Sequence, residues 1–226
     1  LGFAVAPRIN AAGRLEDMSI GIECLLSEDM TDARSRAVRL HDLNQERRVI
    51  EQGMQEEALQ ILKQLALEDA AAPVAMTLYQ SGWHQGVIGI LASRIKDRLH
   101  RPTIAFADGD AGELKGSARS IPGIHIRDIL DAVATRHPGL ITRFGGHAMA
   151  AGLTLPRTAY RQFAAAFVEE VERHAQDVHL QAVLESDGEL AENEFQLPLA
   201  TELRFGGPWG QHFPEPVFDG RFTVVS

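Results

Sequence analysis

The sequence predicts a mixed α/β domain that is preceded by one long helix and followed by a small unit with β character. Three observations lead to this prediction. Apolar residues recur at helical spacing over about 31–65, and short apolar runs alternate with amphipathic stretches from 74 to 171. The final run, 217–225, is rich in β-branched and aromatic side chains around Gly220, which fits a turn.

The first predicted element is the long helix. Thr31 or Asp32 is the expected N-cap, because both side chains accept hydrogen bonds from free N–H groups of a first turn. The alanine-rich tract before Pro73 ends the element, since proline has no N–H group to donate. An apolar stripe follows the helix at Ile50, Met54, Ala58, Ile61 or Leu62, and Leu65.

The α/β domain follows as alternating strands and helices, with a separate small unit from Gln181 onward. Strands are expected at 74–79 and 103–107, and an extended segment at 115–119. Helices are expected from Ile88 to Leu99, from 126 to 135, and along a stripe formed by Tyr160, Phe163, Phe167 and Val171.

A glycine pair followed by a histidine is the first candidate site. Segment 144–152 reads Phe-Gly-Gly-His-Ala-Met-Ala-Ala-Gly, and its alanines and methionine are good helix formers. This order predicts a glycine loop, with His147 at the N-terminus of a helix, where free N–H groups favour a phosphate. The alternative is that small residues let this segment pack closely against a neighbour.

A second candidate lies at 115–119. In extended backbone, side chains alternate, so Lys115, Ser117 and Arg119 share one face. A hydroxyl between two cations suits a phosphate, which arginine can bind through two oxygens. The alternative is an ordinary exposed strand face with solvated charges.

Three further residues stand beside probable loops or glycines. His84 follows the Ser81-Gly82 turn and precedes a helix, a usual place for a functional loop, although a structural role is equally open. Arg14 is either a nucleic-acid contact or part of a salt bridge between domains. Arg143, beside the glycine pair, is a further candidate phosphate contact.

Charge and composition narrow the classes of partner. The net charge is −9, but residues 81–161 contain 11 Lys and Arg against 6 Asp and Glu. The basic excess therefore coincides with the candidate sites, where a phosphate backbone would require it. No apolar run is long enough to span a bilayer, and Cys24 is the only cysteine, so we expect a cytoplasmic protein without internal disulfides and a buried, unreactive thiol.

Three segments in this order, 82–90, 115–120 and 144–152, closely resemble the DHHA1 domain of the DHH phosphoesterase superfamily, in the form found in the RecJ family of single-strand exonucleases. Segment 6–15 is similar to the end of the preceding DHH domain. Segment 205–218 resembles the stretch that leads into an OB-fold, with Phe213 where that family more usually has asparagine.

The resemblance implies a DHHA1-type mixed-sheet sandwich with four parts. They are the end of a DHH domain at 1–26, a connecting helix at 27–70, the DHHA1 domain at 71–176 and the start of an OB-like unit at 177–226. The family's Asp-x-Asp and Asp-His-His metal motifs do not occur in the sequence. We therefore expect a segment of a longer enzyme, inactive alone, with Mn²⁺ or Mg²⁺ bound outside this chain.

The activity implied is 5′-to-3′ exonuclease digestion of single-stranded DNA in repair and recombination. Single-stranded DNA is the implied partner, together with a helicase and a single-strand-binding protein, and without a membrane. His147 would donate to a phosphate near the metals. The residues implied to bind substrate are Arg14, His84, Lys115, Ser117, Arg119, Arg143, Gly145, Gly146 and His147.

Two other functions fit parts of the sequence. The Gly-Gly-His motif also suits a DHH phosphodiesterase for oligoribonucleotides or cyclic dinucleotides. The missing metal motifs suit a non-catalytic nucleic-acid-binding module, like the DHHA1 appendage of alanyl-tRNA synthetase. The long connecting helix and the Pro-Glu-Pro segment at 214–216 favour the exonuclease.

Overall fold

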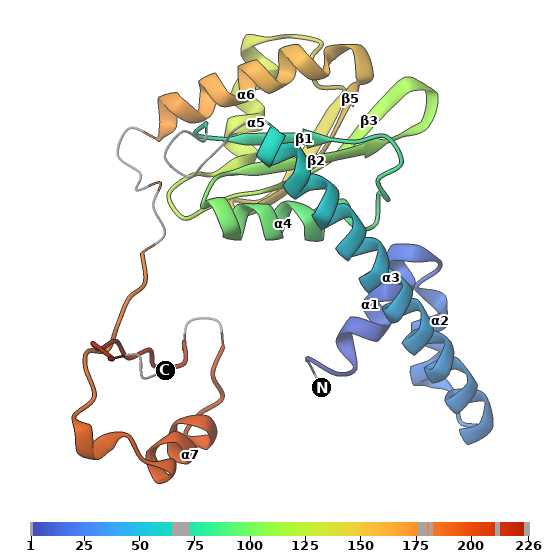
Figure 1. The fold of residues 1–226 in the computed structure, drawn as a ribbon. Coiled ribbons are helices and arrows are strands. Elements are labelled where there is room, and N and C mark those ends of the chain that lie inside the picture. The colour runs from blue at the N-terminus through green and yellow to red at the C-terminus, as the bar shows by residue number, and fades with distance from the viewer. Residues whose placement is uncertain (1, 65–72, 176–179, 181–182, 211–212, 224–226) are drawn as a thin grey trace. The chain divides into compact units, whose positions relative to one another are not determined.

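The structure is a computed structural model of the 226-residue chain, and it describes residues 2–64, 73–175, 180, 183–210 and 213–223 (Figure 1). Internal contacts divide the chain into two units, Leu1–Leu180 and Gln181–Ser226. The separate C-terminal unit predicted from Gln181 is therefore present. The boundaries proposed at 26, 70 and 176 stay predictions.

Three helices open the first unit: α1 (Ala6–Leu15), α2 (Ser19–Leu26) and α3 (Met30–Gln64). The small side chains of Ala11 and Ala12 let α1 lie close against Leu40 and Leu43 of α3, and all four are buried. The long helix that the apolar stripe predicts is confirmed over its described length. None of the described helices combines the length and the apolar character needed to cross a membrane.

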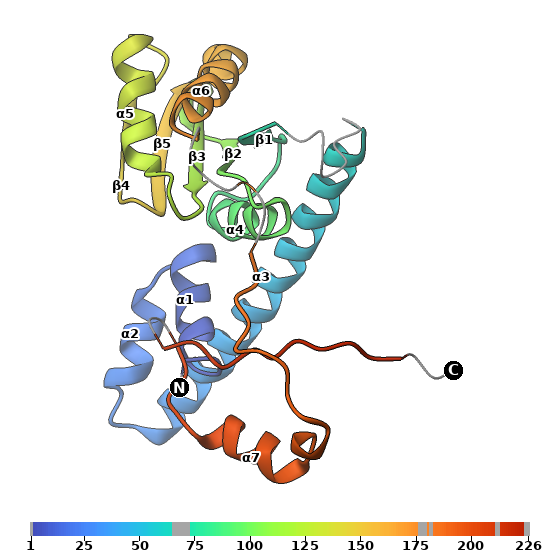
Figure 2. The same ribbon diagram turned by 90° about the vertical axis from the view of Figure 1, so that its left-hand side faces the viewer.

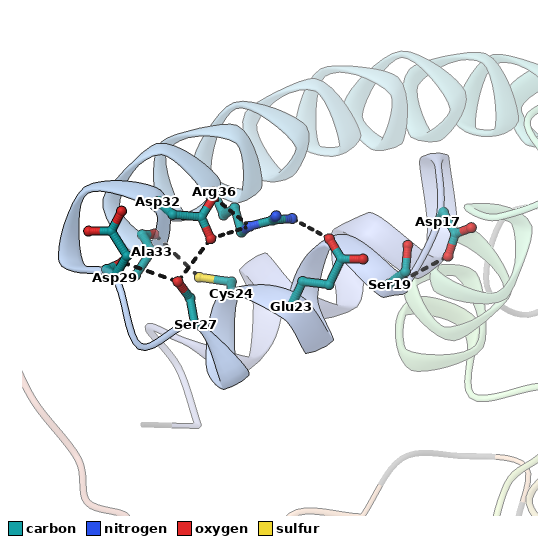
Figure 3. Close-up of polar contacts among 9 residues, drawn as sticks. All are labelled: Asp17, Ser19, Glu23, Cys24, Ser27, Asp29, Asp32, Ala33 and Arg36. Atoms are coloured by element: carbon teal, nitrogen blue, oxygen red, sulfur yellow. Dashed lines mark hydrogen bonds and ion pairs between the residues drawn. The ribbon is translucent and has the colours of Figure 1, made fainter.

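The start of α3 differs from the prediction by one to three residues (Figure 3). The Asp29 carboxylate accepts the N–H of Thr31 at 2.9 Å, so Asp29 and not Thr31 or Asp32 makes the capping contact. Asp32 instead accepts hydrogen bonds from Ser27 at 2.8 Å and from Arg36 at 2.9 Å, and the Arg36 bond lowers the pKa of Asp32. Which residue caps a helix depends on the path of the chain just before the first turn, and the residue types alone do not reveal that path.

Figure 3 also shows how α2 is held to α3. Arg36 extends from α3 to the Glu23 carboxylate of α2, while the thiol of Cys24 lies 3.6 Å from the carbonyl oxygen of Ala33. The predicted burial of Cys24 is only partial. These contacts fasten the N-terminal half of α3, whose opposite end packs on the α/β domain.

The α/β domain is built on a five-stranded sheet in the order β1-β2-β3-β5-β4. β1 and β2 are parallel, and the other neighbouring strands are antiparallel, which confirms the predicted mixed sheet. The strands are β1 (Met76–Tyr79), β2 (Thr103–Asp108), β3 (Glu113–Arg119), β4 (Arg143–Gly146) and β5 (Ala150–Pro156).

Helices cover both faces of the sheet, with α4 (Ile88–Leu99) on one and α5 (Ile126–Arg136) and α6 (Tyr160–His174) on the other (Figures 1 and 2). On the α5–α6 side, Phe106 packs edge-on against Phe163. On the α4 side, Leu91 belongs to a core that Met54 and Leu62 of α3 complete. The sheet is thus the middle layer of the predicted sandwich.

Segment 144–152 forms a β-hairpin and not a helix start, so the predicted helix N-terminus at His147 is wrong. β4 and β5 pair through this segment, with Gly145 opposite Gly152. Pairing with β3 gives the backbone of β5 its hydrogen bonds, and this tertiary contact overrides the helix propensity of alanine and methionine. The anion site expected from a helix dipole at His147 is therefore absent.

The C-terminal unit differs from its prediction as well. Its described part contains α7 (Leu197–Phe205) and an isolated bridge between Gly210 and Phe213, and residues 217–223 form no strand. Residues 224 and 225 of the predicted strand lie outside the described ones. The Val217 carbonyl accepts the N–H of Asp187 at 2.7 Å, and the N–H of Asp219 donates to the Gly188 carbonyl at 3.2 Å, but these two bonds do not continue into a ladder.

Close backbone contact joins α1 to the loop before α4. Arg14 donates from Nη1 to the Gly86 carbonyl at 3.2 Å, and a Cβ on Gly86 would overlap the carbonyl oxygen of Arg14 and lie 2.8 Å from its carbon. Beside this contact, the buried Trp83 donates to Glu57 of α3 at 2.7 Å. The loop is therefore fixed to both α1 and α3.

We expect Gly86→Ala to lower the free energy of unfolding by about 1–3 kcal/mol, because the added methyl group meets backbone that has no rotamer to change. Gly53→Ala is the matched control. Gly53 lies exposed within α3 with open space around its Cβ position, so alanine should stabilise by about 0.5–1 kcal/mol. Chemical denaturation of both variants measures the difference, and equal stabilities would contradict the close contact.

Candidate phosphate-binding site

The candidate site lies on the half of the sheet that α4 leaves open. Along β3, the side chains of Leu114 and Ala118 are buried, while those of Lys115, Ser117 and Arg119 point to the other face and are half-buried. The prediction that these three polar side chains share one face is confirmed. They point to the same face as α4, where helix cover ends near β3.

Strand register extends this face into two rows. Lys115 lies opposite Thr154, which lies opposite Arg143, so the first row is polar. In the second row, Ser117 lies opposite Gly152, which lies opposite Gly145. The second row has no side chain beyond Ser117, so the backbone forms the floor of an open pocket of about 480 Å³.

Thr154 organises the polar row. Its hydroxyl accepts from Arg143 Nε at 3.2 Å and lies 3.4 Å from Lys115 Nζ, and its side chain is buried. Lys115 also lies 3.4 Å from the Glu113 carboxylate. Thr154 was not predicted from the sequence, although its place opposite Lys115 follows once β5 is recognised as a strand.

Two arginines meet at the other end of the face. Arg119 donates from Nη1 to Ser117 Oγ at 3.1 Å and to the Ala118 carbonyl at 2.8 Å. Burial, and then repulsion by the guanidinium of Arg14, lower the pKa of Arg119. Among the described residues, neither arginine forms an ion pair with a carboxylate. The pair is thus arranged to receive an anion.

Gln85 lines the pocket and was not predicted from the sequence. Its amide donates to the Asp108 carbonyl at 2.7 Å, at the end of β2. The Asp108 carboxylate accepts from Tyr79 at 2.7 Å and from Ser81 at 2.9 Å, and the bond from Tyr79 lowers its pKa. Asp108 therefore holds the loop that presents Gln85, a long-range contact with no local sequence signal.

The remaining predicted residues are placed differently. The His84 ring accepts the N–H of Gly86 at 3.1 Å through Nδ1, so this nitrogen is occupied within its own loop. His147 is exposed at the hairpin, where its backbone N–H donates to the Ala150 carbonyl at 2.8 Å. Neither histidine lines the pocket, and neither does Gly146. Lys115, Ser117, Arg143 and Gly145 do line it, with Arg119 beside them.

The described residues offer no ligand set for a metal ion. No group of three or more His, Cys, Asp and Glu side chains converges within them. The chemistry of this site is that of cations, a hydroxyl and open backbone, which binds anions. Divalent cations would require converging oxygen ligands that these residues do not supply.

Known proteins resemble this chain in sequence and in fold. Residues 71–176 match the DHHA1 domain family. This stretch is similar to DHHA1 domains. Over all 226 residues it is 54% identical to the single-stranded-DNA-specific exonuclease RecJ of Dickeya dadantii and 50% identical to that of Escherichia coli, and it spans 39% of each. The resemblance to the RecJ family, given above from three motifs, is confirmed.

Solved structures place the fold in the same family. The DHHA1 domain and its flanks superpose on RecJ from Thermus thermophilus in complex with Mn²⁺, with a TM-score of 0.76 at 33% identity. That alignment covers 96% of this chain and 30% of the other. A second structure of the same protein, in complex with Mg²⁺, gives a TM-score of 0.74 at 31% identity.

The two hairpin glycines of the DHHA1 domain should respond differently to alanine. Gly146 has φ +152°, and a Cβ there would overlap the Ala150 carbonyl oxygen and lie 2.7 Å from Ala151 Cβ. We expect Gly146→Ala to cost about 1–3 kcal/mol of stability. Gly145 has open space at its Cβ position, so Gly145→Ala should change stability by less than about 0.5 kcal/mol. Thermal unfolding distinguishes them, and two equally stable variants would contradict the hairpin geometry.

Proposed function

We propose that this chain binds phosphate groups of single-stranded DNA, and that the whole protein is a metal-dependent exonuclease that digests single-stranded DNA from the 5′ end in repair and recombination. The names of its relatives support this proposal, although the chain spans only 39% of those relatives. Cytoplasmic location, and a helicase and a single-strand-binding protein as partners, belong to the same proposal.

The observation that carries the proposal is the meeting of Arg14, Ser117 and Arg119. Gly86 packs against the backbone of Arg14, and Gly89, three residues later, packs against the Arg119 guanidinium and the Ser117 hydroxyl. Burial, and then the charge of Arg14, lower the pKa of Arg119, and neither arginine forms an ion pair with a described carboxylate. A phosphate would relieve this repulsion and accept charge-assisted hydrogen bonds from both arginines and from the serine hydroxyl. The same groups would stabilise negative charge that develops on phosphorus oxygens during hydrolysis.

The pocket beside these residues suits a nucleotide. Its volume of about 480 Å³ falls in the range of small-ligand sites, about 300–1,000 Å³. Gly145 and Gly152 keep its floor free of side chains, so a sugar-phosphate chain can approach the backbone closely. Lys115 and Arg143, held at Thr154, add two cations along one wall.

Metal ions would supply the activated water for phosphodiester hydrolysis, as in other two-metal phosphoesterases. The RecJ structures from Thermus thermophilus contain Mg²⁺ or Mn²⁺. Because the described residues lack a ligand set, we assign the metal to another part of the whole protein. This chain would contribute the opposite wall, which binds and orients the strand.

Arg119→Ala should weaken binding of a 5′-phosphorylated single-stranded oligonucleotide about 10- to 100-fold, since one charge-assisted contact contributes roughly 1.5–3 kcal/mol. The dependence of log affinity on log salt should also fall by about 0.7 per lost phosphate contact. Arg127→Ala, an exposed arginine on α5 across the sheet, is the matched control. Fluorescence anisotropy over a salt titration gives both quantities, and equal binding by the two variants would reject the site.

This polypeptide alone should not hydrolyse single-stranded DNA in the presence of Mn²⁺, because its described residues bring no metal ligands together. Incubation with end-labelled DNA measures release of nucleotides. Metal-dependent release that a mock preparation lacks and that Arg119→Ala abolishes would overturn the assignment of the metal to another part of the protein.

A further inference from the structure

A second groove lies between α1, α3 and α4, and Arg14 is one of the residues that line it. It encloses about 720 Å³, and its walls come from all three helices, whose approach is visible in Figure 2. Four of its lining residues are arginines and only one is acidic. Such an excess of positive charge in a concave surface attracts polyanions.

The single acidic residue does not neutralise the groove. Glu51 is buried, and its carboxylate is shared between Arg47, one helical turn away on α3, and Arg94 of α4 at 3.3 Å. Its charge is thus already divided between two cations. Arg48 is exposed at the rim, and no described carboxylate pairs with it. The groove therefore retains a positive rim that can contact an anion.

Arg14 connects the groove to the phosphate site. It lines the groove, and its backbone packs against Gly86, three residues before Gly89, whose Cβ position lies 2.8 Å from Arg119 Nη2 and 2.9 Å from Ser117 Oγ. On the helical surface, Asn10 stands four residues before Arg14 and lines the same groove. Cations and polar groups therefore continue from β3 across α1 toward α3 and α4.

We propose that this groove binds the backbone of single-stranded DNA next to the phosphate held at Ser117 and Arg119, an inference that rests on the proposed function. The arginines come from three helices and do not converge on one point, which fits successive phosphates better than one small anion. The amides of Asn10, Gln52 and Gln55 can meet base edges, since each both donates and accepts.

The test compares 5′-phosphorylated oligothymidylates of two and of about 12 nucleotides, of which only the longer one can extend from the phosphate site into the groove. In the double variant Arg48→Gln with Arg94→Gln, we expect affinity for the long strand to fall roughly tenfold, and the salt slope to fall by about 1.4, or 0.7 per phosphate. Affinity for the dinucleotide should change less than about twofold, because Ser117 and Arg119 are untouched. Arg127→Gln on α5 is the charge-matched control.

Each outcome decides between the two sites. The groove would be contradicted if the double variant bound the long strand with wild-type affinity. It would also be contradicted if affinity fell equally for the long strand and the dinucleotide. Suppose that Arg119→Ala has wild-type affinity for both oligonucleotides, while the double variant has a lowered affinity for the long one. This result would contradict the phosphate site and support the groove. Arg48→Gln alone keeps the test valid if loss of the Arg94 contact to Glu51 lowers the melting temperature, since Arg48 has no described ion pair to lose.

Discussion

The register of β3 against β5, and of β5 against β4, determines both the core and the candidate site. With Ser117 opposite Gly152, every second residue of β3 faces the core of α5 and α6, and the others face the open side. A slip of one residue would bury Lys115 and Arg119 and expose Leu114, because side chains alternate along a strand. The apolar core therefore specifies, through register, which cations lie beside the glycine floor.

Without a bound anion, the cations at this site disfavour folding. Part of the Arg119 side chain is removed from water and Arg14 repels its charge, and these two effects lower the pKa of Arg119. Elsewhere, as at Arg36 with Asp32 and Glu23, the chain pairs its arginines with carboxylates. Where a fold leaves like charges unpaired in this way, a bound anion restores the balance, and such local conflicts with stability are expected at functional sites.

Much of the fold follows from local pattern, and the site only partly does. Helical spacing predicted α3 and α6, and alternation placed Lys115 and Arg119 on one face, since both depend on near neighbours in sequence. The hairpin around His147 was missed because its pairing with β3 is a long-range contact that overrides alanine's helix propensity. Thr154 was missed for the same reason, since its importance appears only once β5 lies between Lys115 and Arg143.

The candidate site also depends on a contact far from the sheet. Arg14 belongs to α1, and it lies beside Arg119 because the carbonyl of Arg14 packs against Gly86, where no side chain fits. Trp83 and Glu57 fix the same loop to α3, and Asp108 fixes it to the sheet through Gln85. The loop before α4 thus joins three elements distant in sequence. Because a phosphate held by Arg14 and Arg119 would contact both α1 and β3, binding and the packing of these elements should stabilise each other.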